Sequence, residues 1–217
     1  MKQYLVIGLG NFGATVVREL SRLGCRVTAV DRDRDKVQLM KDVASVVAIV
    51  GNAANHEFVA RLQVPNFDGV LVSTGEDSHA SILITMYLKE LSAQAIIVKA
   101  NSVDHAKILT KVGATQTVIP EQQMAAKVAH SLAQPNMIDF LPLASNFVVA
   151  ELKPAPHLVG RRLRDSHIRA EYQVQVIAVR KAPSDRLIFV PDGDYVIQAS
   201  DVLFVLGLES DIVRMRG

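Results

Sequence analysis

Six short runs of apolar residues recur through the first 133 residues, and longer amphipathic stretches separate them. The runs are rich in Val and Ile and do not alternate with polar residues, which is typical of strands buried on both faces of a parallel sheet. Two of the intervening stretches end at a glycine, as helices often do: residues 11–23 before Gly24 and residues 102–112 before Gly113. The pattern predicts an α/β fold with a Rossmann-like, doubly wound parallel sheet. The expected strands are residues 4–7, 26–31, 46–50, 70–73, 96–98 and 117–119.

The pattern changes after residue 133. Residues 134–146 contain Pro135, Pro142 and a short apolar cluster at 137–141, so we expect a linker or crossover that packs against another surface. Residues 147–217 hold four further strand-like runs with turn signals between them, which predicts a small α+β domain. The expected strands are 147–152, 174–179, 187–190 and 202–206, with helical segments between 158 and 170 and after 210. The predicted domains are therefore 1–133 and 147–217.

Composition excludes several classes of protein. The chain has 24 Lys and Arg against 22 Asp and Glu, a balance that argues against a dedicated nucleic-acid binder. We interpret its densest basic cluster, Arg161, Arg162 and Arg164, as a solvated helix face. No apolar run approaches the length of a membrane span, and the N-terminus lacks the features of a signal peptide. The single Cys25 permits no intrachain disulfide. We expect a cytosolic protein.

A glycine-rich segment, GLGNFG at residues 8–13, follows the first expected strand and opens the first expected helix. In such a segment Gly8 permits a tight turn, Gly10 lets the backbone approach a diphosphate, and Gly13 lets helix and strand pack closely. The N–H groups at the helix N-terminus then face the phosphates. Asp31 ends the second strand, where an acid accepts hydrogen bonds from ribose hydroxyls. The combination predicts nucleotide binding; the alternative is a glycine turn used only for packing.

Polar or small residues follow the other expected strands, at the edge of the sheet that borders the ligand crevice in this fold. They are Asn52 and Ala53, Thr74 and Gly75, Lys99, and Glu121. Asn52 could reach an adenine edge or could be a turn residue. Lys99 could meet a phosphate, and Glu121 could hold a divalent cation. Asp31 disfavours the 2′-phosphate of NADP, although Arg32 could counter it; the residues alone do not separate NAD from ATP or ADP.

Catalytic patterns are missing from the sequence. Hydride transfer needs a second domain that positions a substrate against the nicotinamide, and the remaining segment is small. The chain has no CxxC or HExxH motif, and His56, His79, His105 and His130 fall in or beside expected helices. We therefore expect no enzyme; the alternative is an NAD-dependent oxidoreductase. A redox-sensing transcriptional regulator would need a helix-turn-helix with a basic recognition helix, which neither end offers.

Two apolar segments indicate assembly. Residues 81–91 are apolar nearly all the way round a helix, and such a helix is buried on both sides. One side would meet the sheet and the other a second subunit. The cluster at 137–141 suggests the same; the alternative is that the second domain covers both.

Together, the glycine segment, Asp31, residues 51–53, the 81–91 helix and Pro120-Glu121 resemble the RCK domains of the bacterial TrkA/KtrA potassium-uptake regulators. Residues 146–217 are similar to their C-terminal (TrkA-C) domain. The resemblance implies a cytosolic, nucleotide-sensing regulatory subunit, lying against the inner face of the membrane. It further implies octameric rings of dimers, a KtrB/TrkH-type membrane potassium transporter as partner, and ATP, ADP or NAD(H) as ligand.

The resemblance also implies residue roles: Asn52 at the adenine, Lys99 near the phosphates, and Glu121 holding a divalent cation, Mg²⁺ or Ca²⁺, between subunits. Relatives of the KtrA type commonly carry Arg at the position of Asn11, so a preference for ATP over ADP is in question. Some relatives bind cyclic di-AMP in their C-terminal domain, in a region that matches Ile168, Ile177 and Pro191. The candidate ligand-binding residues are Gly8, Gly10, Asn11, Phe12, Gly13, Asp31, Arg32, Asn52, Ala53, Thr74, Gly75 and Lys99, with Glu121 as the candidate metal ligand.

Overall fold

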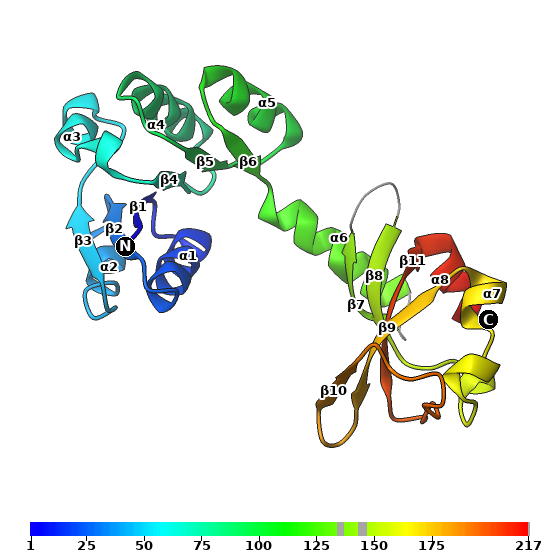
Figure 1. The fold of residues 1–217 in the computed structure, drawn as a ribbon. Helices are drawn as coiled ribbons and strands as arrows, with labels where there is room; N and C mark the ends of the chain where they lie inside the picture. The colour runs from blue at the N-terminus through cyan, green and yellow to red at the C-terminus, as the bar shows by residue number, and fades with distance from the viewer. Residues whose placement is uncertain (134–136, 143–146, 217) are drawn as a thin grey trace. The chain divides into compact units, whose positions relative to one another are not determined.

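The computed structural model describes residues 1–133, 137–142 and 147–216. The chain forms two compact units, Met1–Glu121 and Gln122–Gly217 (Figure 1). The helix α6, Pro120–Ala133, begins in the first unit and continues in the second. No helix of the described segments is long and apolar enough to cross a membrane.

The first unit is a six-stranded, wholly parallel sheet with the strand order β3-β2-β1-β4-β5-β6. This order steps outward from β1 in both directions, which is the doubly wound arrangement predicted from the sequence, and the fold class is confirmed. The strand ends differ from the expected ones by at most one residue. The strands are β1 Gln3–Ile7, β2 Arg26–Asp31, β3 Val46–Val50, β4 Gly69–Val72, β5 Ile96–Lys99 and β6 Gln116–Val118. The helices are α1 Asn11–Arg22, α2 Arg34–Gln38, α3 His56–Arg61, α4 Ser78–Glu90 and α5 Val103–Val112, with a 3₁₀ turn at Val64–Asn66.

Both faces of this sheet are covered, which explains the continuous apolar runs. Successive strand residues point to opposite faces, so Leu5 and Ile7 join one core cluster and Val6 joins another. The first cluster includes side chains of α4 and α5, such as Ile84 and Leu109. The second includes side chains of α1 and α2. On either face of the sheet, each large apolar side chain that is completely buried contributes about 1.5–3 kcal/mol to the free energy of unfolding.

The second unit contains a five-stranded antiparallel sheet with the order β10-β9-β11-β8-β7. Its helices α7 and α8 cover one face, where Ile168 and Ile212 join the buried core. The elements are β7 Met137–Pro142, β8 Phe147–Leu152, α7 Ile168–Tyr172, β9 Gln175–Lys181, β10 Arg186–Phe189, β11 Val202–Leu208 and α8 Glu209–Arg216.

Two expectations for this region differ from the structure. Residues 137–142, expected within a linker, form strand β7, which pairs with β8. The sequence of one segment does not show which strand it pairs with, so the apolar residues of β7 could not be distinguished from those of a linker packed against another surface. The helical segment expected between 158 and 170 is divided into 3₁₀ turns at Pro156–Leu158 and Leu163–Asp165 and the short helix α7. Gly160 and His167 both have positive φ, which interrupts a continuous helix.

Candidate functional site

The glycine segment forms the turn between β1 and α1, and two of its glycines are required by the fold itself. Gly8 has φ +94°, and a Cβ there would lie 2.1 Å from the Ser73 carbonyl oxygen. A Cβ on Gly13 would lie 1.9 Å from the Gly8 carbonyl oxygen. A Cβ on Gly10, by contrast, would meet nothing within 4 Å. Gly10 is the N-cap of α1, so the space in front of it adjoins the N–H groups that open the helix.

Asp31, at the carboxyl end of β2, holds this turn in place. Its Oδ2 accepts a hydrogen bond of 2.6 Å from the Leu9 backbone N–H, and its Oδ1 accepts one of 2.8 Å from the Asp33 N–H. Each carboxylate oxygen retains a further acceptor site. Asp31 can therefore position the glycine turn and still accept hydrogen bonds from a ribose.

A cavity of about 290 Å³ lies at the carboxyl ends of β1 to β4 and at the start of α4. Eight of the candidate ligand-binding residues line it: Gly8, Gly10, Asp31, Arg32, Asn52, Ala53, Thr74 and Gly75. Its size is near the lower end of the range for small-molecule sites. Five candidates do not line it: Asn11, Phe12, Gly13, Lys99 and Glu121.

Four polar residues that the sequence reasoning missed also line this cavity: Lys36, Ser73, Asp77 and His79. Asp77 accepts a 3.0 Å hydrogen bond from the Ala80 N–H and so caps α4. It also forms an ion pair of 3.9 Å with Arg32, which comes from the end of β2. The Asp77 cap preceding residues 78–90 was a readable signal in the sequence, since Asp is a preferred N-cap residue.

The arrangement suits a phosphorylated nucleoside. The N-terminus of α1 offers N–H groups for a diphosphate, and Asp31 offers acceptors for ribose hydroxyls. Asn52 accepts a hydrogen bond of 3.0 Å from the Ala54 N–H through its Oδ1, which leaves its amide NH₂ to face an acceptor on a base.

Lys99 and Glu121 are brought together by the fold. The Lys99 Nζ lies 2.5 Å from the Glu121 Oε1, and the lysine side chain is only 14% exposed. The Lys99 hydrogen bond is the largest cause that lowers the pKa of the Glu121 carboxyl. In the described part of the chain, no group of three or more His, Cys, Asp or Glu side chains converges to hold a metal ion. A cation at Glu121 would therefore need further ligands from a nucleotide or another subunit.

The helix α4, which lines the cavity, is tied to α5 through His105. This histidine is only 6% exposed. Its Nδ1 accepts a hydrogen bond of 3.2 Å from the Asn101 N–H, so its Nε2 carries the proton and donates to the Ser81 Oγ at 3.0 Å. Burial lowers the pKa of His105 from its ordinary value of 6.5. The side chain thus has a structural role between two helices.

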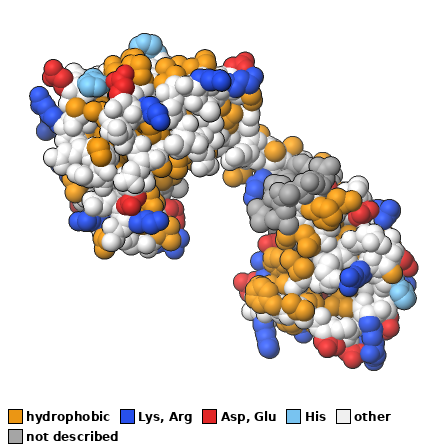
Figure 2. Space-filling model, turned by 45° about the horizontal axis from the view of Figure 1, so that its top comes forward, with side chains coloured by type: hydrophobic (Ala, Val, Ile, Leu, Met, Phe, Trp, Pro, Cys, Tyr) orange, Lys and Arg blue, Asp and Glu red, His pale blue; other side chains and the backbone are white. Residues whose placement is uncertain are grey.

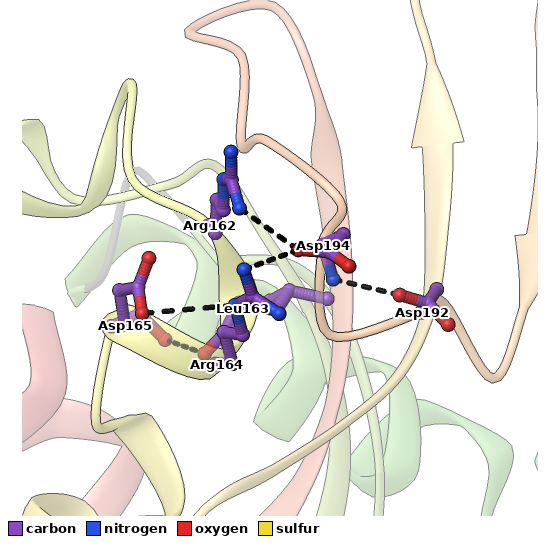
Figure 3. Close-up of polar contacts among 7 residues, drawn as sticks. Arg162, Leu163, Arg164, Asp165, Asp192 and Asp194 are labelled. Atoms are coloured by element: carbon purple, nitrogen blue, oxygen red, sulfur yellow. Dashed lines mark hydrogen bonds and ion pairs between the residues drawn. The ribbon is translucent and has the colours of Figure 1, made fainter.

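The basic cluster of the second unit is not a helix face. Arg162 and Arg164 converge on Asp194 Oδ1, at 3.0 and 2.8 Å (Figure 3). The Asp194 N–H donates to Asp192 Oδ1, which holds the turn that carries the acid. The side chains of Arg162 and Arg164 are about half exposed, as a solvated face requires, but they lie at a 3₁₀ turn and share an acidic partner about thirty residues away in the sequence. Figure 2 likewise shows basic and acidic side chains interspersed on the visible face.

A second cavity, of about 210 Å³, adjoins this ion-pair cluster. Ile168 and Pro191 line it, as do the cationic residues Arg164 and Arg169. Ile177, the third residue of the region matched to cyclic di-AMP binding, does not line it.

Comparison with known proteins decides the family. The TrkA-N domain model matches residues 4–120, and the TrkA-C domain model matches residues 147–216. The chain belongs to the TrkA/Ktr family of potassium-uptake regulators. It is 38% identical to the Ktr system potassium uptake protein C of Bacillus subtilis (strain 168), over 98% of this chain and 95% of that protein. It is 36% identical to the Ktr system potassium uptake protein A of Vibrio alginolyticus, over 98% of this chain and 96% of that protein.

Solved structures agree with this membership of the TrkA/Ktr family at the level of the fold. The RCK domain of GsuK superposes with a TM-score of 0.68 at 18% identity, over 99% of this chain and 47% of the GsuK chain. An NAD(P)-binding domain of an exopolyphosphatase-related protein from Archaeoglobus fulgidus superposes with a TM-score of 0.54 at 25% identity, over 62% of this chain and 99% of that domain. The resemblance to RCK domains drawn from the sequence is confirmed.

Proposed function

We propose that this chain is the nucleotide-sensing regulatory subunit of a potassium-uptake system, and that it works by ligand-driven conformational change rather than by catalysis. The observation that carries the proposal is the cavity at the carboxyl ends of β1 to β4, where the α1 N-terminus and Asp31 meet in one space. The potassium-uptake role follows from relatives that match this chain over nearly its whole length.

The ligand of this cavity is an adenine nucleotide, ATP, ADP or NAD(H). Among proteins of this fold, the GsuK channel has been solved with NAD and with ADP. For the present chain the proposal depends on its own residues: Asp31 for the ribose, the α1 N-terminus for the diphosphate and Asn52 for the base. Asn11 is shorter than Arg and uncharged, so any contact it makes with a terminal phosphate is weaker. A divalent cation at Glu121 would offset phosphate charge.

The partner is a membrane potassium transporter subunit of the KtrB/TrkH type, and the chain acts as a homo-oligomer, an octameric ring of dimers, on the cytosolic face of the membrane. Exposed apolar side chains support assembly. On α6, Met124, Val128 and Leu132 recur every four residues and are 60%, 50% and 77% exposed. On α4, Met86 is exposed and Tyr87 is half-buried, beside the side that packs on the sheet.

Cyclic di-AMP is the ligand proposed for the second unit. Its two phosphates would meet Arg164 and Arg169, and its bases would meet the apolar side chains of Ile168 and Pro191. Calorimetric titration with cyclic di-AMP, carried out on the wild-type protein and on an Arg169→Ala variant, tests this site. Heat of binding that is present for wild type and lost in the variant supports it; no heat for wild type refutes it.

Thermal unfolding with ATP, ADP, NAD, NADH and NADPH, each with and without Mg²⁺, tests the main proposal. A ligand at about 100 times its Kd adds about 2.7 kcal/mol to the free energy of unfolding. We expect ATP, ADP or NADH to raise the melting temperature and NADPH to have little effect. If no nucleotide raises it, the cavity is not a nucleotide site. Turnover of NADH that persists through repurification would favour the oxidoreductase alternative.

A further inference from the structure

The ion pair between Lys99 and Glu121 joins the carboxyl end of β5 to the first turn of α6. Lys99 is the last residue of β5 and pairs in register with Val118 of β6. The Ala100 N–H donates to the Val118 carbonyl oxygen at 2.8 Å, which holds the two strand ends together. Glu121 follows three residues later, so its carboxylate returns to the Lys99 ammonium. The start of α6 is thereby fastened to the sheet.

The two partners differ in their dependence on each other. The Lys99 side chain is 14% exposed, whereas that of Glu121 is 65% exposed. An ammonium withdrawn from water needs an anion, while an exposed carboxylate can return to water at little cost. Lys99 therefore requires some negative partner, but that partner need not be Glu121.

A bound phosphate would supply such a partner. Val98 of β5 pairs in register with Val72 of β4, so the next residues along the two strands are Lys99 and Ser73. Ser73 lines the cavity, and its carbonyl lies against Gly8 of the glycine turn. Lys99 thus lies beside Ser73 at the same edge of the sheet, with β4 between it and the turn that opens α1. Its flexible four-carbon stem allows the ammonium to turn toward either side.

We propose that Lys99 exchanges partners when nucleotide binds: it pairs with Glu121 when the site is empty and with a phosphate of the ligand when the site is filled. The exchange depends on the proposed nucleotide site and describes how that site is coupled to the rest of the chain. Its ligand class is a nucleoside di- or triphosphate, or a dinucleotide, because the exchange needs an anionic phosphate near the α1 N-terminus.

The exchange acts at the junction of the two units. Glu121 is the last residue of the first unit, and Gln122 begins the second. When Lys99 turns to a phosphate, the first turn of α6 loses its side-chain attachment to β5. Nucleotide binding in the first unit therefore changes the freedom of the helix that leads into the second.

The variant Glu121→Gln tests whether the ion pair competes with nucleotide or only stabilises the fold. Without Glu121, the largely buried Lys99 side chain has lost its partner in the nucleotide-free protein, so a phosphate no longer competes with a carboxylate. Titration with ADP in the presence of EDTA removes any contribution from a divalent cation at Glu121. We expect Glu121→Gln to bind ADP at least about 5-fold more tightly than wild type, in the range of typical coupling between sites. The matched control is Glu19→Gln, which removes an exposed 2.8 Å ion pair with Arg22 on α1.

Hydrogen–deuterium exchange of the α6 amides gives a second readout. In wild type, ADP should speed exchange at the start of α6; in Glu121→Gln, exchange there should be fast without ADP. The proposal is overturned if Glu121→Gln binds ADP no more tightly than wild type and if ADP does not change hydrogen exchange in α6. The nucleotide site itself would still stand in that case. If wild type binds no nucleotide at all, the proposed function fails and the exchange fails with it.

Discussion

Replacing Asp31 with Asn should destabilise the empty protein, before any ligand is considered. The carboxylate accepts one backbone N–H on each oxygen, from Leu9 at 2.6 Å and from Asp33 at 2.8 Å. An amide has one acceptor oxygen and one NH₂ donor, so an Asn at this position must turn its NH₂ toward one of the two N–H groups. One partly buried hydrogen bond to a charged group is lost, and two donors face each other.

A hydrogen bond to a charged group contributes about 1.5–3 kcal/mol. We therefore expect Asp31→Asn to lower the free energy of unfolding of the first unit by about that amount in urea titrations without nucleotide. The affinity for ATP, ADP or NADH should fall as well, because the glycine turn is no longer held by Leu9 and the ribose loses a charged acceptor.

The matched control is Asp33→Asn, two residues away. Asp33 is the N-cap of α2, and its Oδ1 accepts from the Asp35 N–H at 2.9 Å. Asn is an equally good N-cap residue, so this variant carries the same charge change with little expected loss of stability. If Asp31→Asn is no less stable than Asp33→Asn in the empty protein, the carboxylate does not hold the glycine turn, and our account of the site is wrong.

Four further variants test other parts of the structure. Gly10→Ala should fold normally, because the added Cβ meets nothing within 4 Å, but it should weaken nucleotide binding, because that Cβ occupies the open space in front of the α1 N-terminus. Gly13→Ala should lower the free energy of unfolding in urea by about 1–3 kcal/mol, because its Cβ would lie 1.9 Å from the Gly8 carbonyl oxygen. Equal stability of the two variants would contradict this reasoning. The pKa of His105 is lower in the folded chain than its ordinary value of 6.5, so the unfolded chain takes up the proton first. The free energy of unfolding should be at its full value above about pH 6.5 and fall as the pH is lowered below it, and a His105→Gln variant measured from pH 5 to 8 should lack this component; an unchanged pH profile would show that another group titrates. Tyr87→Asp should reduce the oligomer measured by light scattering while circular dichroism stays native; a persisting oligomer would show that this face of α4 is not an interface.

Much of the first unit was predictable because its signals are local. Buried parallel strands require continuous apolar runs, and the turn between β1 and α1 requires glycine at two positions where a Cβ would clash with a carbonyl oxygen. Eight of the candidate ligand-binding residues follow from their places at the carboxyl ends of strands. Whether they bind a nucleotide remains a prediction that the ligand screen must test.

The remaining differences come from contacts between residues distant in the sequence. Strand β7 was expected as a linker because its pairing with β8 is not encoded in residues 137–142 alone. Arg162 and Arg164 are solvated as expected but lie at a 3₁₀ turn rather than on a helix face, and their shared partner Asp194 comes from a later turn. The place of His79 in the cavity wall depends on how α4 packs against the sheet.

The sequence by itself determined the succession of strands along the first unit, the glycine turn and the acid at the end of β2, because each depends on local periodicity or on a backbone conformation that only certain residues adopt. Only the tertiary structure decided that Asp31 supports the glycine turn, that His105 joins α4 to α5, and that Lys99 is paired with Glu121. Each of these is a polar contact between elements, and its energy depends on burial and on distances of a few ångströms. Such contacts exist only after the apolar strands have packed into a sheet.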